Sequence, residues 1–181
     1  MNKAQKLEKI EREIELCVEC KLKKHGMAVP GEGNSDADII FVGEAPGRTE
    51  AATGRPFVGR SGKLLRGAIE SIGLNVREVF ITSPVKYLPD YITPTPEDIL
   101  HGMTHLSKQL EVINPKIIVL LGSVAARGVL SEKLKISNKH GTTMRRNGKT
   151  YFISYHPAAA IRFQKFKATF LEDFAKIRDL I

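Results

Sequence analysis

The chain has 181 residues, of which 42% are hydrophobic, and this suits one domain over residues 1–181 with a proper core. No apolar run approaches the roughly 20 residues of a membrane span, and the charged residues 1–15 do not resemble a secretion signal. We therefore expect a soluble intracellular protein. The formal net charge of +8 favours polyanionic partners, although a basic surface kept for solubility explains the charge equally well.

The first half of the chain predicts two helices around one buried strand. A helix is expected to Leu22, and the apolar run 37–42 suits a buried strand that ends at a glycine. Residues 43–62 are rich in glycine and proline and are predicted as one long loop. Such a loop inside a compact domain is more often functional than idle. An amphipathic helix is expected over 61–72.

The second half continues the alternation of strands and helices. Strands are predicted at 79–85 and 116–121, with a helix between them that Thr95 caps and that runs to about residue 113. Asn147-Gly148 lies between two strand-like runs and indicates a hairpin over 142–154. A final helix is expected over 163–181. The alternation predicts an α/β domain with a mostly parallel sheet.

Three polar segments follow predicted strands, and we expect them to meet at one edge of the sheet. They are Gly43-Glu44-Ala45-Pro46-Gly47, Thr82-Ser83-Pro84 and His156-Pro157. The glycine-rich segment matches neither a dinucleotide fingerprint nor a phosphate loop. This convergence is the strongest functional signal that the residues give by themselves.

Each candidate at this edge has a structural interpretation beside the functional one. Glu44 either positions a water or is a solvated loop acid. Phe57 either forms a platform for a flat base or packs its loop onto the sheet. His156 either donates a proton to an anionic leaving group or is an ordinary structural histidine.

Taken together, these segments resemble the uracil-DNA glycosylase superfamily, specifically its thermostable prokaryotic family-four branch. The resemblance extends from about Cys17 to the C-terminus. Its first motif matches at Gly43–Gly47 and at Gly54-Arg55-Pro56-Phe57-Val58-Gly59, and its second at His156-Pro157-Ala158-Ala159-Ala160-Ile161-Arg162. The resemblance implies a three-layer α/β/α fold with a central, mostly parallel four-stranded sheet. It also implies a monomeric DNA-repair enzyme of the prokaryotic cytoplasm.

The resemblance implies that the enzyme flips uracil out of DNA and hydrolyses its glycosidic bond, leaving an abasic site. The flipped base would stack on Phe57, while His156 donates to the uracil oxygen. Glu44 would favour the oxocarbenium-like sugar and orient the attacking water. The substrate-binding residues would also include Gly43, Ala45, Gly47 and Ser83.

The same resemblance implies which residues contact DNA. A loop from Ala158 to Arg162 would enter the minor groove, with Ile161 or Arg162 filling the gap left by the flipped nucleotide. Lys63, which continues the first motif, is expected to contact DNA as well.

The chain departs from the family at its iron–sulfur cluster. Family members hold the cluster with four cysteines, but this chain has only Cys17 and Cys20, and Tyr87 and Gly102 stand at the other two positions. By themselves the two cysteines fit half of a metal site, a redox pair or two ordinary cysteines. His101 and His105 lie one helical turn apart and make a Cys2His2 zinc site conceivable. We expect instead that packing replaces the metal.

Ser83 is a second departure, because the family usually carries asparagine there. A hydroxyl reads fewer groups of the uracil edge than an amide does, so we expect weaker discrimination, by about 1–3 kcal/mol. This leaves uracil as the expected base and admits other deaminated bases. The competing functions are a non-catalytic binder of such bases and a small-molecule enzyme on a similar sheet.

Overall fold

The computed structural model describes residues 1–91 and 93–181. Its central sheet has the strand order β2-β4-β3-β6-β8-β7. The four inner strands are parallel to one another, and each edge strand is antiparallel to its neighbour. The expected parallel sheet of four strands is therefore confirmed, and an antiparallel strand extends it at each edge. In chain order the strands are β2 (Glu32–Gly33), β3 (Ile39–Val42), β4 (Phe80–Thr82), β6 (Ile117–Leu121), β7 (Thr142–Arg146) and β8 (Lys149–Ser154).

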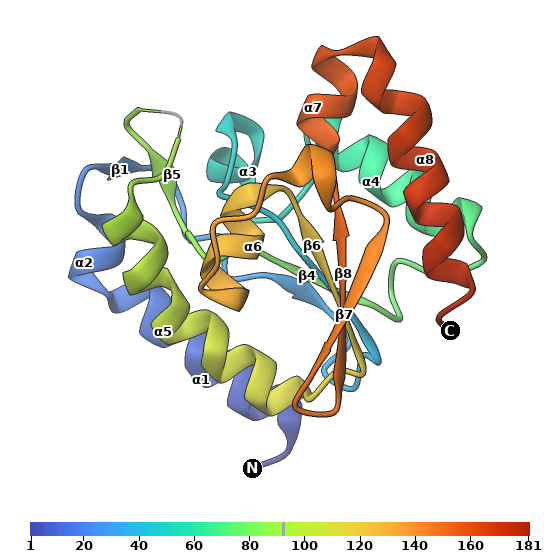
Figure 1. The fold of residues 1–181 in the computed structure, drawn as a ribbon. Helices are drawn as coiled ribbons and strands as arrows, with labels where there is room; N and C mark the ends of the chain where they lie inside the picture. The colour runs from blue at the N-terminus through green and yellow to red at the C-terminus, as the bar shows by residue number, and fades with distance from the viewer. Residues whose placement is uncertain (92) are drawn as a thin grey trace.

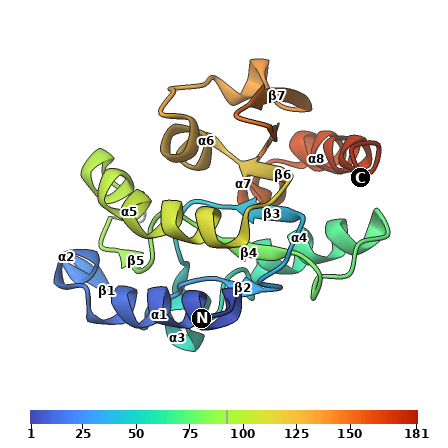
Figure 2. The ribbon, with the colours of Figure 1, turned by 90° about the horizontal axis from the view of Figure 1, so that it is seen from below.

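Helices cover both faces of this sheet, so that the fold has three layers (Figures 1 and 2). One face carries α4 (Arg60–Ser71) and α8 (Gln164–Arg178), and the other carries α5 (Pro96–Ile113) and α6 (Ser123–Leu130). Helix α1 (Lys3–Leu16) runs along α5. Shorter elements connect these layers: α2 (Val18–Lys21), α3 (Arg48–Thr53), α7 (Pro157–Arg162), the 3-10 turn η1 (Ile136–Asn138), and a separate pair of strands, β1 (Lys24–His25) and β5 (Leu88–Pro89).

The two central strands are apolar throughout because both of their faces are covered. Every residue of β3 and β6 is buried. Phe41 and Val119 pack in the cluster beneath α4 and α8, whereas Ile40 and Ile118 pack beneath α5 and α6. Side chains alternate between the faces of a strand, and the sequence signal for these strands is therefore a short continuous apolar run.

Two local predictions are confirmed in detail. Thr95 caps α5 in a capping box, in which its side chain accepts from the N–H of Asp98 and the Asp98 carboxylate accepts from the N–H of Thr95. Asn147 and Gly148 both have positive φ, 51° and 73°, and connect β7 to β8 as the hairpin requires. These features depend on neighbouring residues only, which is why the sequence predicts them well.

Three segments differ from their predictions. The expected helix to Leu22 ends at Leu16, because Cys17 is extended and begins the separate helix α2. The expected loop 43–62 contains helix α3, which a left-handed Gly54 ends. The segment Ala158–Arg162, expected to be a DNA-contacting loop, is part of helix α7. Pro157 occupies the first position of this helix, and three alanines follow it in the sequence.

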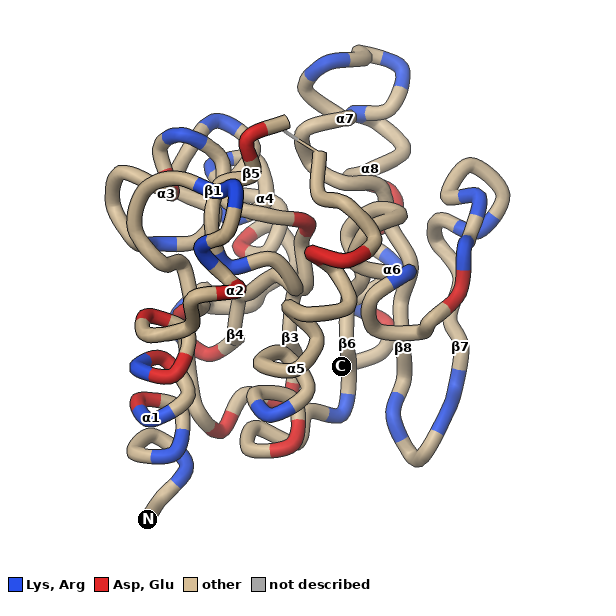
Figure 3. Tube along the Cα trace, turned by 90° about the vertical axis from the view of Figure 1, so that its left-hand side faces the viewer, with Lys and Arg blue, Asp and Glu red and all other residues tan. Residues whose placement is uncertain are grey.

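Charge is unevenly distributed over these elements. Lys and Arg gather at the turn between α7 and α8 and along β7, whereas α1 carries both signs (Figure 3). Within the described residues, no helix is long and apolar enough to cross a membrane.

Candidate active site

A cavity of about 230 Å³ opens at the carboxyl ends of β3, β4 and β8. This is the edge at which sites of open parallel sheets form. The cavity is lined by seven of the predicted residues, and these are Glu44, Ala45, Gly47, Phe57, Ser83, His156 and Ala158. The three polar segments that the sequence placed at one sheet edge therefore meet in one cavity.

Phe57 and His156 form adjacent walls of the cavity. Their ring centroids lie 5.7 Å apart and their planes are tilted by 36°. Gly43 lies behind both rings: a Cβ on this residue would come within 2.4 Å of the Phe57 ring and 3.7 Å of His156 Nε2. Gly43 itself is not among the lining residues, so its position favours a role in making room for Phe57 rather than in binding substrate.

Phe57 is 9% exposed and packs with the core cluster beneath α4, so it both anchors its loop and faces the cavity. Its backbone has φ 50°, which is uncommon for a bulky residue and is typical of functional sites. Arg66 holds this conformation by donating from Nε to the Phe57 carbonyl and from a second nitrogen to the Pro56 carbonyl, both at 2.9 Å. Glu32 accepts from the same guanidinium at 2.6 Å.

Glu50 organises the same loop and was missed by sequence reasoning. Its buried carboxylate accepts from the backbone N–H groups of Val58 and Gly59 at 2.9 and 2.7 Å. The only local signal is an acid a few residues before a Gly/Pro-rich turn, which is too common to identify the role. Arg66 gave no signal either, because a basic residue on an amphipathic helix is usually solvated.

His156 is held in one tautomer. Its Nδ1 accepts from the backbone N–H of Ala158 at 3.2 Å, so in the neutral ring the proton is on Nε2. The imidazole is half-buried at the cavity wall, and this desolvation lowers its pKa to about 4. At neutral pH the residue is therefore an uncharged donor through Nε2–H.

Glu44 contributes a carboxylate to the lining of the cavity, and Ser83 contributes a hydroxyl. Burial raises the pKa of the Glu44 carboxyl above its ordinary value. The Ser83 hydroxyl donates to the carbonyl of Val85 at 2.8 Å. Its hydrogen is thereby occupied, and the lone pairs of Oγ remain to accept from a ligand.

A second groove begins where the cavity ends. It is lined by Ala158, Ile161 and Arg162 of α7 together with residues of α3 and α4, and it shares Glu50, Ser61 and Ala158 with the cavity. Ile161 is 40% exposed. Lys63 lies exposed on the first turn of α4 but is not among the residues that line this groove.

Lys86 is a buried cation behind the cavity that the sequence did not single out. Its Nζ donates to the Pro30 carbonyl, to Thr82 Oγ1 and to Gln109 Oε1, at 2.9, 2.8 and 2.8 Å. Burial lowers the pKa of this amine to about 7. Lys86 does not line the cavity.

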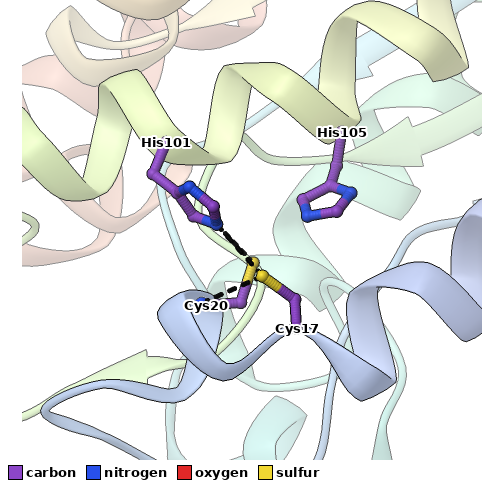
Figure 4. Close-up of side chains that lie close together, drawn as sticks. All are labelled: Cys17, Cys20, His101 and His105. Carbon is purple, nitrogen blue, oxygen red and sulfur yellow. Dashed lines mark hydrogen bonds between the residues drawn. The ribbon is translucent and has the colours of Figure 1, made fainter.

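The candidate metal ligands also come together, where α2 packs against the middle of α5. Cys17, Cys20, His101 and His105 offer ligand atoms that all lie within 4.8 Å of one another (Figure 4). They lie outside the cavity described above.

The positions where the resemblance places two further cysteines are filled by packing. Tyr87 is 4% exposed in a cluster with Ile10, Ile14 and Cys20. Gly102 lies against the backbone of the segment after β4, where a Cβ would come within 2.1 Å of the Pro84 carbonyl oxygen. The residues present therefore do not fit a four-cysteine iron–sulfur cluster.

Comparison with known proteins agrees with this geometry. Residues 30–177 match the model of the uracil DNA glycosylase superfamily. The chain is 41% identical to a type-4 uracil-DNA glycosylase of Sulfurisphaera tokodaii, over 96% of this chain and 84% of that protein. It is 40% identical to a protein of the same name from Archaeoglobus fulgidus, over 96% and 92% of the two chains, and 35% identical to one from Thermotoga maritima, over 97% and 94%. The chain therefore belongs to the uracil-DNA glycosylase superfamily, in its type-4 group.

Proposed function

We propose that this protein excises uracil from DNA by hydrolysing the N-glycosidic bond of a flipped-out nucleotide. The observation that carries the proposal is the cavity in which an aromatic face, an uncharged imidazole donor and a desolvated carboxylate meet: Phe57, His156 and Glu44. Relatives at 35–41% identity bear the name of this activity. The product is an abasic site.

The base is bound between Phe57 and His156. Flipping costs a few kcal/mol, and this cost is lowest for weakly paired bases. Stacking on the Phe57 ring repays about 1–3 kcal/mol. As the C1′–N1 bond breaks, its electron pair moves onto the base, and Nε2–H of His156 stabilises the negative charge on the uracil oxygen. A donor that is already oriented by Ala158 needs no reorganisation at that moment.

Glu44 acts on the sugar side of the breaking bond. Its carboxylate stabilises the positive charge that develops on the deoxyribose and orients a water toward C1′. The water oxygen bonds to C1′ as the C1′–N1 bond breaks. The water releases one proton and the departing uracil anion takes up one proton, so that the reaction is a hydrolysis. Its burial strengthens the electrostatic effect of the carboxylate.

Ser83 reads the edge of the base. Because its hydrogen is donated to Val85, its Oγ accepts from the N3–H of uracil. Cytosine presents an acceptor at that position, so two lone pairs would face each other. One contact discriminates less than the two that an amide makes, and we propose that other deaminated bases are slower substrates.

DNA is bound along the groove beside α7. Ile161 or Arg162 fills the gap left by the flipped nucleotide, and Lys63 contacts a phosphate. No lysine lines the cavity among the described residues, which favours a monofunctional glycosylase over an enzyme that also cuts the strand through a Schiff base. We infer a monomer that acts in the prokaryotic cytoplasm, where its DNA substrate lies.

The test is an excision assay on a double-stranded oligonucleotide with one uracil. We expect the strand to break only after alkali treatment, and a matched oligonucleotide with thymine to stay intact. Breakage without alkali would show a lyase activity. Binding of the uracil oligonucleotide without any release of base would overturn the proposal in favour of a non-catalytic binder.

A further inference from the structure

We infer that Cys17, Cys20, His101 and His105 form a mononuclear Cys2His2 site for a tetrahedral divalent cation, with zinc as its occupant. The inference is independent of the proposed excision activity, because none of these four residues lines the active-site cavity. It also replaces the expectation that packing alone fills this region.

The distances between the ligand atoms favour a single ion. Cys17 Sγ and Cys20 Sγ lie 3.2 and 3.3 Å from His101 Nε2, and all four ligand atoms lie within 4.8 Å of one another. With zinc–sulfur bonds of about 2.3 Å and zinc–nitrogen bonds of about 2.0–2.1 Å, tetrahedral ligands are about 3.3–3.8 Å apart. A two-iron cluster would instead hold the sulfurs and the imidazoles on different irons and separate them further.

His105 gives the second observation. Its ring is 6% exposed, and neither Nδ1 nor Nε2 has a hydrogen-bond partner within the described part of the chain. Buried imidazoles rarely lack any partner. The ring lies on the same side of α5 as His101 and points toward the two cysteines (Figure 4). A metal ion bound at one ring nitrogen would satisfy it.

The surroundings orient the other ligands as they do in known zinc sites. Glu19 Oε2 lies 3.2 Å from His101 Nδ1, so that Nδ1–H donates to the carboxylate and Nε2 presents its lone pair to the cysteines. The backbone N–H of Cys20 donates to Cys17 Sγ at 3.3 Å. The break between α1 and α2 at Cys17 produces this arrangement, and the site then ties that break to α5.

The chemistry of the donor set selects zinc. Two thiolates and two imidazoles suit a tetrahedral zinc ion and exclude cations that prefer oxygen ligands, such as Mg²⁺ and Ca²⁺. Binding releases two protons, one from each thiol, and the two thiolates balance the charge of the ion. The centre is therefore neutral, which suits its partial burial between α2 and α5.

The test is metal analysis of the full chain, purified without an affinity tag that binds metals. We expect about one zinc per chain, without iron or acid-labile sulfide. Replacing the zinc with Co²⁺ should give the visible bands and the thiolate charge-transfer absorption of a tetrahedral cobalt centre. Iron with sulfide would overturn the inference, and so would the absence of tight zinc binding after zinc is offered to the reduced protein.

Variants separate a metal ligand from a packing residue. His105→Ala and Cys17→Ser should each lower the zinc content at least tenfold, whereas His25→Ala should retain it, because His25 is exposed and pairs with Asp90. For the unaltered chain, a strong chelator should lower Tm by about 5 °C or more, and one equivalent of zinc should restore it. This measurement remains decisive if a variant fails to fold, and an unchanged Tm would contradict a structural site.

Discussion

The ring of Phe57 lies 5.7 Å from the imidazole of His156, and the two planes are tilted by 36°. The rings come from opposite halves of the chain, since Phe57 follows α3 and His156 follows β8. Because the walls are tilted, a flat base can lie on the face of one ring while its exocyclic oxygen meets the edge of the other. The chemistry proposed for this protein depends on that arrangement.

Removing either polar group should lower excision far more than DNA binding. We expect Glu44→Gln and His156→Ala to reduce the single-turnover excision rate by about 100- to 10,000-fold. Affinity for uracil DNA should change by less than about threefold, because phosphate contacts dominate it. Glu70→Gln, at an exposed site on α4, serves as the control. Equal losses in rate and in affinity would indicate a merely structural role.

The pH dependence of excision should report Glu44 rather than His156. In the proposed mechanism Glu44 acts as a carboxylate, so the rate should fall as pH falls through its pKa, which burial raises above 4.5. His156 has a pKa of about 4 and stays neutral from pH 5 to pH 8. The measurement is the pH profile of the single-turnover rate, whose acid limb should disappear in Glu44→Gln. A limb near 6.5 that disappears in His156→Ala would contradict this assignment.

Glu50 should stabilise the protein through the loop that carries Phe57. Glu50→Ala leaves two partly buried N–H groups, on Val58 and Gly59, without their acceptor. We expect the free energy of unfolding to fall by about 2–4 kcal/mol, measured by urea denaturation at an unchanged m-value. Glu78→Ala, at an exposed position, should change it by less than about 0.5 kcal/mol. Similar stability of the two variants would rule out this role.

Ser83 should set the preference for uracil over cytosine. Ser83→Ala removes the only hydroxyl proposed to read N3–H, so the ratio of the excision rates should fall by about 10- to 100-fold. Ser83→Asn should raise the same ratio, because an amide both donates and accepts. Competition between uracil and cytosine oligonucleotides measures this ratio of excision rates. Ser107→Ala, at an exposed site on α5, serves as the control. A ratio that none of these changes alters would remove Ser83 from base recognition.

Lys63 should contribute to DNA affinity through a phosphate. Lys63→Ala should reduce the slope of log K against log salt concentration by about 1, uniformly across DNA sequences. Lys9→Ala on α1 should leave the slope unchanged, since α1 and α7 lie at opposite ends of the molecule (Figure 1). Fluorescence anisotropy at several salt concentrations provides the measurement. A loss of affinity that does not depend on salt would argue against phosphate contacts.

The sequence by itself determined the features that depend on neighbouring residues or on recurring motifs. The apolar runs of β3 and β6, the capped start of α5 and the Asn147-Gly148 turn follow from local chemistry. The two motifs around Glu44 and His156 identified the family and, with the rule for parallel strands, the edge of the sheet that carries the cavity.

The tertiary structure alone decided the roles that depend on distant partners. Glu50 and Arg66 look like ordinary surface charges until folding pairs them with backbone groups of the Phe57 loop. The tautomer of His156 is set by the backbone N–H of Ala158 at the start of α7. The cluster of two cysteines and two histidines forms because the helix break at Cys17 brings the cysteines to α5. The physical reason is that hydrogen bonds and ligand distances are set by three-dimensional packing between segments that a linear pattern does not relate.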